Sequence, residues 1–339
     1  MHHPLRLCCD RAALISNYRQ LEARAGTRTG AAVKANAYGL GARAVVQHLL
    51  AEGCRDFFVS TWWEASELDF LPEGTLAVLH GLGPDDQPRP GVRPVLITAE
   101  QIARWKASGH SADPCDLMVD TGMNRLGLGL DEVSTADGLN IHTLHSHLAC
   151  ADEDHELNAT QLARFRDLRA AVPAQRYSLA NSAAIFLGED YGFDLVRPGL
   201  ALYGGMPRQE ARGVIGAVVR LEAQILQLRS VVPGQSVGYN ATFVAHERLR
   251  AAILNIGYAD GYLRSLAASG SARFGAVRLP IIGRISMDLI AVNASAAPAL
   301  REGDWLEFDF DLEKLAATSG LSQYELLTGL GRRWQRSWT

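Results

Sequence analysis

Residues 31–39 read Ala31-Ala32-Val33-Lys34-Ala35-Asn36-Ala37-Tyr38-Gly39, a short apolar run that ends on a lysine and is followed by small residues and a tyrosine. Most lysines lie on solvated helix faces, where water hydrates the charge. A lysine at the end of a buried strand must be paired, shifted in pKa or covalently occupied, and such lysines are candidates for Schiff-base chemistry. Lys34 is therefore the first candidate for a catalytic residue; the alternative is a side chain that extends to water.

Short apolar runs recur from residue 29 to about 204 and mostly alternate with helical patterns. Eight strands interleaved with helices predict a (β/α)8 barrel of the TIM type, with a doubly wound open sheet as the alternative. The proline-rich link between the third and fourth strands predicts no helix. The helices are expected at 42–52, 99–108 and 157–172, and the strands at 29–34, 56–60, 75–80, 93–98, 116–120, 141–147, 176–180 and 194–197.

After Gly205 the rhythm changes, because apolar runs are joined by turns that carry glycine and proline rather than by helices. We therefore predict two domains, a barrel at residues 8–212 and a mostly β C-terminal domain at residues 213–339. A basic tail at 332–336 is expected to be a packed or solvated terminus. In the second domain, strands are expected at 214–231, 250–256, 273–282, 288–293 and 305–310, and helices at 312–317 and 323–330.

The composition excludes several classes of protein. The 339 residues carry a net charge of -4, with 47% hydrophobic and 21% charged residues, which is typical of a globular protein and gives no electrostatic case for nucleic acid or membrane partners. Five scattered cysteines predict neither a disulfide framework nor a zinc knuckle. No signal-like segment or long apolar run is present. We expect a cytoplasmic protein.

Polar residues fall at the expected carboxyl ends of the barrel strands, where barrel enzymes assemble their active sites. The loops after strands seven and eight commonly bind phosphate in such barrels. A phosphate pocket beside a strand-end lysine suggests pyridoxal 5'-phosphate (PLP). Taken singly, a serine that caps a helix and a glycine in a turn are the simpler interpretations. The residues at these strand ends are Lys34, Arg125, His147, Asn181, Ser182, Arg197 and Gly199.

Six ordered motifs resemble those of alanine racemase, a PLP-dependent family of fold type III. Six motifs in order across both domains are more specific than any one of them. The resemblance implies a PLP-binding barrel followed by a β domain, a homodimer whose active sites contain residues of both chains, and the interconversion of L-alanine and D-alanine to supply D-alanine for peptidoglycan. The motifs are Val33-Lys34-Ala35-Asn36-Ala37-Tyr38-Gly39, Asp120-Thr121-Gly122-Met123-Asn124-Arg125-Leu126-Gly127, Ala180-Asn181-Ser182-Ala183, Arg197-Pro198-Gly199 with Leu202-Tyr203-Gly204, Ile256-Gly257-Tyr258-Ala259-Asp260-Gly261 and Gly283-Arg284-Ile285-Ser286-Met287-Asp288.

The same resemblance implies the role of each site residue. Lys34 matches the lysine that binds the cofactor and Tyr258 the second catalytic base. Arg125 and the backbone amide of Met287 match the groups that bind the substrate carboxylate. Residues that match cofactor contacts are Tyr38 and the phosphate-side Asn181, Ser182, Gly199 and Leu200, together with His147 and Arg197 beside the ring.

Racemisation removes the α proton from one face of a planar carbanion and returns a proton to the other face, so it needs two opposed bases. Lys34 is expected on one face and Tyr258, from the partner subunit, on the other. The chain departs from the family at Met118, where many alanine racemases carry a carbamylated lysine that orients the substrate-binding arginine. A thioether cannot be carbamylated, so we expect another group to hold Arg125.

Other functions were weighed against this one. A metal site is expected to be absent, because no second cluster completes a defined geometry around the histidines and acidic residues that follow strand six. A broader-specificity amino-acid racemase is the main alternative. A non-catalytic PLP-binding protein and a barrel decarboxylase are disfavoured by the second domain and by Tyr258. The candidate metal ligands weighed were His142, His145, His147, Asp152, Glu153, Asp154 and His155.

Overall fold

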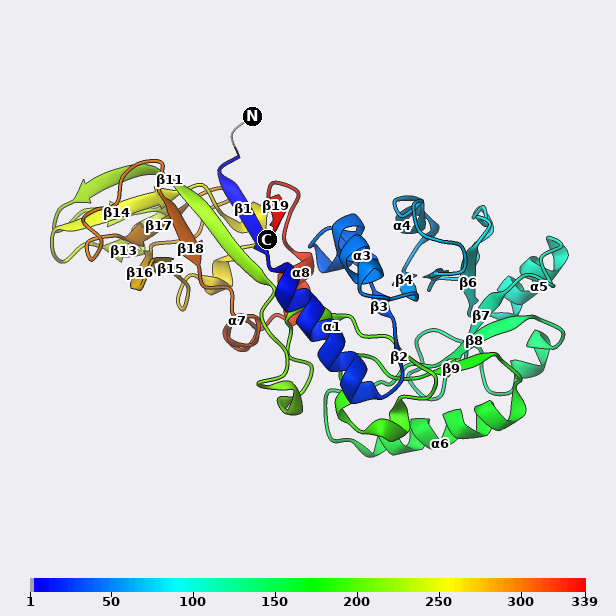
Figure 1. Cartoon of the computed structure of the whole chain (residues 1–339). Coiled ribbons are helices and arrows are strands. Elements are labelled where there is room, and N and C mark those ends of the chain that lie inside the picture. The colour runs from blue at the N-terminus through cyan, green and yellow to red at the C-terminus, as the bar shows by residue number, and fades with distance from the viewer. Residues whose placement is uncertain (1–2) are drawn as a thin grey trace. The chain divides into compact units, whose positions relative to one another are not determined.

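The computed structural model describes residues 3–339 and divides into two compact units. A barrel unit spans Leu14–Gly216, and a β unit combines the residues up to Ala13 with Ala217–Thr339. The chain therefore begins in the β unit, leaves it to form the barrel, and returns (Figure 1). The expected division was 8–212 and 213–339. No helix among the described residues is both long and apolar enough to cross a membrane.

Parallel strands in chain order form the core of the barrel unit. The eighth expected strand, β10 (Leu195–Val196), pairs with β2 (Arg28–Thr29). Arg197 N donates to Ala180 O at 2.9 Å and Gly30 N donates to Val196 O at 2.9 Å, so backbone hydrogen bonds link β10 to both of its neighbours. The predicted barrel is confirmed. Its sheet contains β3 (Ala31–Ala32), β4 (Phe57–Val59), β5 (Leu76–Val78), β6 (Val92–Leu96), β7 (Cys115–Met118), β8 (Ile141–His145) and β9 (Arg176–Ser178).

Helices lie outside these strands (Figure 1). The three predicted helices are confirmed, and the described residues between β5 and β6 contain no helix, as the prolines there indicate. The side chain of Thr98 caps the helix after β6 by accepting a hydrogen bond from Gln101 N at 3.2 Å. The α-helices are α1 (Arg11–Ala25), the short α2 (Lys34–Tyr38), α3 (Ala42–Ala51), α4 (Trp62–Ser66), α5 (Ala99–Ala107) and α6 (Glu156–Ala171), and the 3-10 turns are η1 (Val133–Ala136), η2 (Ala184–Phe186), η3 (Glu189–Tyr191), η4 (Leu200–Tyr203) and η5 (Gln209–Ala211).

The β unit is a mostly antiparallel sheet in the order β14-β17-β16-β15-β18-β11-β1-β19, in which β14 also pairs with β11. The long strand β11 therefore contacts three neighbours and curls the sheet on itself. The predicted mostly β domain is confirmed. Its elements are β1 (Leu5–Cys9), β11 (Val219–Val231), β12 (Ser236–Val237), β13 (Phe243–Val244), β14 (Leu249–Leu254), β15 (Ser271–Phe274), β16 (Val277–Ile282), β17 (Ile290–Asn293), β18 (Trp305–Phe308), β19 (Gln335–Trp338), α7 (Leu312–Ser319), α8 (Gln323–Thr328), and the turns η6 (Tyr239–Ala241), η7 (Tyr258–Asp260) and η8 (Arg264–Leu266).

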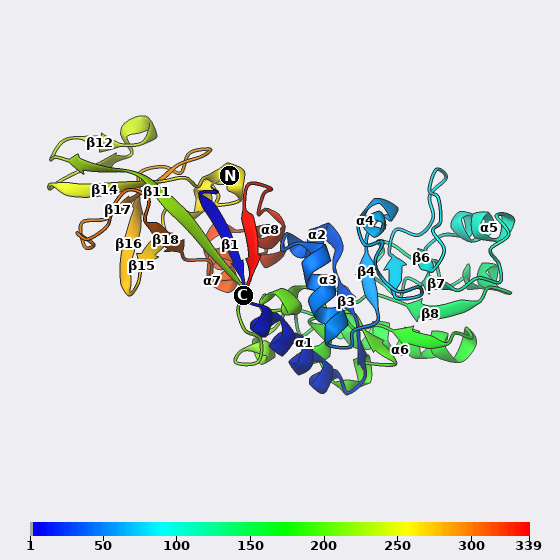
Figure 2. The same ribbon diagram turned by 45° about the horizontal axis from the view of Figure 1, so that its top comes forward.

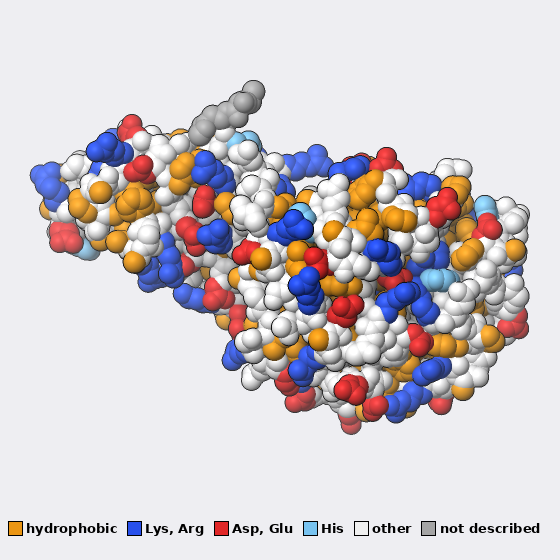
Figure 3. All heavy atoms as spheres, in the orientation of Figure 1, with side chains coloured by type: hydrophobic (Ala, Val, Ile, Leu, Met, Phe, Trp, Pro, Cys, Tyr) orange, Lys and Arg blue, Asp and Glu red, His pale blue; other side chains and the backbone are white. Residues whose placement is uncertain are grey.

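One predicted strand of the β unit was wrong in detail. The segment 273–282 is not one strand, because the chain reverses between β15 and β16 at Gly275, whose φ of 58° favours glycine. The basic tail packs against the unit, as expected of a packed or solvated terminus, and Trp334 within it is 3% exposed. It leads into β19, which pairs in parallel with β1 at the edge of the sheet (Figure 2). Acidic and basic side chains are interspersed on the face shown in Figure 3.

Candidate active site

Lys34 begins a left-handed turn at the carboxyl end of the first barrel strand. Ala35, Asn36, Ala37 and Tyr38 all have φ between 51° and 55°, although none is glycine. Each such residue costs on the order of 1–3 kcal/mol, and this kind of strain concentrates at functional sites. Ala37 N donates to Val33 O at 2.8 Å, and Ala35 N donates to Glu64 Oε1 at 2.6 Å. A bond within the turn and one to Glu64 of helix α4 therefore fix the backbone that carries Lys34.

The surroundings of Lys34 favour its neutral amine. Its side chain is half-buried. Burial lowers the pKa of Lys34, and the positive charges of Arg125 and Arg197 lower it further, while Glu64 acts in the opposite direction. A neutral amine is the form that acts as a base or nucleophile.

Tyr38 reaches the backbone of the loop after β10. A Cβ at position 199 would lie 2.2 Å from the Tyr38 hydroxyl oxygen, so only glycine leaves room for this approach. Tyr203 stacks beside Tyr38 with ring centroids 4.9 Å apart and donates to Ala32 O at 2.8 Å. Turn η4 then begins at Leu200, whose N–H donates no hydrogen bond within residues 3–339. This corner therefore offers an open backbone donor beside Tyr38.

Ser182 joins the two loops that were expected to bind phosphate, and Asn181 orders the first of them. Ser182 Oγ accepts hydrogen bonds from Gly199 N at 2.9 Å and Ala201 N at 3.2 Å, so it connects the loop after β9 to the loop after β10. Asn181 Oδ1 accepts from Ala183 N and Ala184 N, each at 3.0 Å, just before turn η2. Ser182 is thus more than a local cap.

Arg197 is a buried guanidinium without a carboxylate partner within ion-pair distance among the described residues. It is 7% exposed and donates to Ser178 Oγ and, at 2.7 Å, to Ser146 O. Burial lowers its pKa to about 10. His147, half-buried nearby, has its pKa lowered to about 3 by burial and by the positive charges of Arg197, Arg125 and Lys34. Positive charges therefore converge on one end of the barrel.

This cluster of cations fits PLP. The site at the carboxyl ends of the strands brings together a lysine with a lowered pKa, a phosphate-side backbone donor at Leu200, and a guanidinium that can donate to a ring nitrogen but cannot accept its proton. The group that would fill it is an anion, because the charged side chains that face it are mostly positive.

Arg125 lies in an exposed loop that a short β-bridge closes. Leu128 N donates to Met118 O and Asp120 N to Leu128 O, both at 2.9 Å, and Asp120 Oδ1 accepts from Gly122 N at 2.7 Å. The Arg125 guanidinium makes no hydrogen bond within residues 3–339. Met118 is 8% exposed and packs in the apolar core of the barrel.

Tyr258 and Met287 come together in the β unit. Tyr258 N donates to Ser286 O and Ala259 N to Met287 O, both at 3.0 Å. Met287 is 53% exposed, and its N–H donates no hydrogen bond within the described part of the chain. The guanidinium of Arg264 lies 5.1 Å from the centroid of the Tyr258 ring. A phenol and a free backbone donor are thus presented side by side.

The histidines of β8 serve a buried ionic network. His145 Nε2 lies 3.2 Å from Asp116 Oδ2, and Arg93 Nε donates to Asp116 Oδ1 at 2.9 Å. Arg208 binds Asp154 and, at 3.1 Å, Glu210 in the loop region that follows. Residues 3–339 contain no group of three or more candidate metal ligands.

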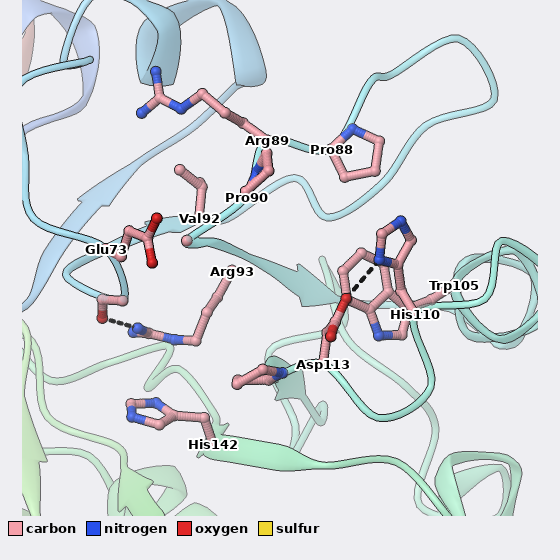
Figure 4. A pocket seen from close by; sticks show the side chains of 13 residues that line it. Glu73, Pro88, Arg89, Pro90, Val92, Arg93, Trp105, His110, Asp113 and His142 are labelled. Carbon is pink, nitrogen blue, oxygen red and sulfur yellow. Dashed lines mark hydrogen bonds and ion pairs between the residues drawn. The ribbon is translucent and has the colours of Figure 1, made fainter.

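A pocket of about 470 Å³ opens at the opposite end of the barrel. It is lined by residues that precede or begin strands, among them Arg93 on β6 and His142 on β8. Figure 4 shows Arg93 bonded to the Gly74 carbonyl and His110 paired with Asp113. The amino ends of the strands form this face, so the pocket is separate from the candidate active site at the carboxyl ends.

Two residues that organise the site were missed by sequence reasoning. Glu64 holds the Lys34 turn and also accepts from Ser60 N at 2.6 Å. Gln161 is fully buried and donates to His147 O at 2.9 Å and Thr121 Oγ1 at 3.1 Å. For Gln161 the only available signal was a polar residue on a predicted helix, which does not name a partner, and Glu64 lies on a helix that was not predicted.

Both parts of the chain match models of known domains. The model described as alanine racemase, N-terminal domain, matches residues 9–207, and the model described as alanine racemase, C-terminal domain, matches residues 218–338.

Relatives match over nearly the full length. The chain is 42% identical to a catabolic alanine racemase of Agrobacterium fabrum, over 98% of this chain and 91% of the relative. It is 41% identical to alanine racemase of Acidiphilium cryptum, over 99% of each. The solved structure of alanine racemase from Bartonella henselae with covalently bound pyridoxal phosphate covers 100% of both chains, with 37% identity and a TM-score of 0.91. The solved structure of biosynthetic alanine racemase from Pseudomonas aeruginosa also covers 100% of both chains, with 33% identity and a TM-score of 0.86.

Proposed function

The chain belongs to the alanine racemase family, and we propose that Lys34 and Tyr258 are the two bases with which it interconverts L-alanine and D-alanine. The enzyme is an isomerase and depends on PLP. The observation that carries the assignment of residues is the placing of Lys34, with its lowered pKa, among cations at the carboxyl end of the barrel.

Bound PLP supplies an electron-withdrawing ring that makes the α proton of an amino acid more acidic. Lys34 is the residue proposed to hold its aldehyde, and the open N–H of Leu200, close to Tyr38 and Gly199, supports this corner as the phosphate subsite. Asn181 and Ser182 are proposed to shape that subsite. Arg197 would donate to the ring nitrogen, and His147 would lie against the ring.

The proposed substrate subsite needs donors for a carboxylate. Arg125 supplies a guanidinium with no hydrogen-bond partner in the described chain, and Met287 supplies an unpaired backbone N–H. Both are exposed, as groups that await a ligand or another subunit must be. A carboxylate held at two points has a fixed α carbon, which lets two bases approach its proton from opposite faces.

The biological setting belongs to the same proposal. We propose a homodimer in which Tyr258 and Met287 of one subunit complete the site around Lys34 of the other, acting in the cytoplasm and supplying D-alanine for peptidoglycan. Met287 is 53% exposed and Tyr258 is half-buried beside it on the β unit, which supports a role at a subunit contact.

Purified protein with PLP and L-alanine should form D-alanine, followed by chiral chromatography. Lys34→Ala should lose covalently held cofactor and activity, whereas Tyr258→Phe should keep the cofactor and lose most activity, because only the second base is removed. If the parent protein formed no D-alanine, the assigned function would be wrong. Racemisation of serine at a comparable kcat/KM would favour a broad-specificity racemase instead.

A further inference from the structure

We propose that Arg333 is a positioning residue that holds the Tyr258 turn and the Met287 loop in one fixed relation, so that the second base and the carboxylate-binding amide act as a single rigid unit. This inference rests on the proposed function of Tyr258 and Met287. Arg333 lies just before β19, in the tail that the sequence presented only as a basic terminus.

The first contact is with the turn that carries Tyr258. Asp260 ends this turn and is 1% exposed. Its Oδ2 accepts from Gly257 N at 2.9 Å, across the base of the turn. Arg333 donates to the same carboxylate from Nε at 2.7 Å and from Nη2 at 2.8 Å. The neighbouring Trp334 Nε1 donates to Asp260 O at 2.8 Å, so the turn is anchored through both side chain and backbone.

The second contact is with the loop that carries Met287. The remaining arm of the Arg333 guanidinium donates from Nη1 to Asp288 Oδ1 at 2.7 Å. Asp288 directly follows Met287, so one planar cation joins the two loops. The backbones of the loops already touch: a Cβ at Gly257 would lie 2.3 Å from Met287 O. A shift of either loop therefore moves the other.

The chemistry of this junction requires arginine. Two carboxylates face one guanidinium, and charge-assisted, two-point hydrogen bonds fix both distance and plane. Without Arg333, Asp260 would be a buried carboxylate without a cation, and Asp288 would repel it. A lysine restores the charge, but its ammonium is a point charge without the planar fork.

The chain offers a matched control. Arg273 also lies in the β unit, its side chain is 51% exposed against 49% for Arg333, and it donates from Nε to Asp309 Oδ1 at 2.9 Å. It makes no contact with either loop among the interactions described for residues 3–339. Arg273→Met therefore removes the ion pair of a similarly exposed arginine of the same unit, away from Tyr258.

The experiment compares Arg333→Met, Arg333→Lys and Arg273→Met as PLP-loaded enzymes. For each we would measure kcat and KM with L-alanine and D-alanine, the α-deuterium isotope effect with each enantiomer, the visible absorbance of bound cofactor and thermal unfolding. We expect Arg333→Met to lower kcat by about tenfold or more, to raise KM, and to keep the cofactor absorbance. Arg333→Lys should recover part of the loss, and Arg273→Met should match the parent.

The isotope effect separates positioning from general loss of stability. If proton transfer by Tyr258 becomes slow, the α-deuterium isotope effect should rise for the enantiomer from which Tyr258 removes the proton. It should fall for the other enantiomer. The proposal would be overturned if Arg333→Met kept the kcat, KM and isotope effects of the parent enzyme. It would also be overturned if Arg273→Met lost as much kcat as Arg333→Met. If Arg333→Met does not fold, Asp288→Asn tests the proposal instead, because it removes only the hydrogen bond from Arg333 to the Met287 loop. The KM of Asp288→Asn should rise, and an unchanged KM would overturn the proposal. An inactive parent would instead refute the proposed function.

Discussion

At the scale of single residues, Gly199 matters because of the space it leaves. Its φ is -129°, so the backbone itself does not require glycine, but a Cβ would lie 2.2 Å from the Tyr38 hydroxyl oxygen. Gly199→Ala should therefore push Tyr38 out of the phosphate corner and weaken PLP binding by about tenfold or more, equivalent to ~1.4 kcal/mol. Cofactor titration followed by absorbance measures this.

The matched control is Gly216→Ala in the same unit. There the nearest atom to an added Cβ is Asn17 Oδ1 at 3.7 Å, so affinity should remain at the parent value. Equal affinities for both variants would remove Tyr38 and Gly199 from the proposed phosphate subsite.

Single residues also show how far sequence reasoning reaches. Lys34 and Arg197 were expected at strand ends because charged groups at the end of an apolar run are visible in the sequence, and both occupy such positions. Glu64 and Gln161 were not found, because their roles depend on partners 29 and 14 residues away that only the folded barrel brings within reach. The left-handed turn after Lys34 was also missed, since no glycine announces it.

At the scale of elements, adjacent strands β7 and β8 carry a buried pH-sensitive pair. Burial lowers the pKa of His145 to about 4, against about 6.5 in an unfolded chain. Burial alone would raise the pKa of Asp116, but Arg93 and the hydrogen bonds from His142 and His145 hold it well below its usual value. Between about pH 6.5 and 4 the unfolded chain binds a proton that native His145 excludes, so the free energy of unfolding should fall as the pH falls.

Urea unfolding of the enzyme at several pH values measures that slope. His145→Gln should reduce the slope of the unfolding free energy against pH by up to about 1.4 kcal/mol per pH unit. Part of the slope should remain, because burial also lowers the pKa of His147 to about 3. Phe58→Leu is the control, because Phe58 packs edge-on against the His145 ring at 5.7 Å and carries no proton. It should lower stability at every pH without changing the slope. If His145→Gln kept the same slope as the parent enzyme, His145 would not be the source of the pH dependence.

Elements also show which parts of the fold were predictable. The barrel strands alternate with helices at regular intervals, so local patterns sufficed to predict their order. The β unit depends on pairings of residues far apart in the chain: β1 pairs Leu7 with Arg336 of β19 and with Leu221 of β11. No local pattern carries such information. The hairpin of β15 and β16 was missed for a different reason, because the turn at Gly275, with its positive φ, was interpreted as part of one continuous strand.

At the scale of the whole molecule, the proposed sharing of active sites between two chains makes a sharp prediction. If Lys34 of one chain works with Tyr258 of the other, a dimer of one Lys34→Ala chain and one Tyr258→Phe chain contains one intact site and one site lacking both bases. If both residues came from one chain, each site of that hybrid would lack one base. Random mixing gives hybrids for half of the dimers, so about a quarter of all sites should be intact.

Two inactive variants, unfolded together and refolded with PLP, should therefore regain about a quarter of the parent activity for L-alanine. Mixing Lys34→Ala with Arg125→Ala provides the control, because both residues belong to the barrel unit and every hybrid site then lacks one of them. Recovery in the first mixture but not in the second requires that the barrel unit of one chain and the β unit of another complete the same site. No recovery in either mixture, with dimers confirmed by light scattering, would mean that each chain carries a complete site of its own.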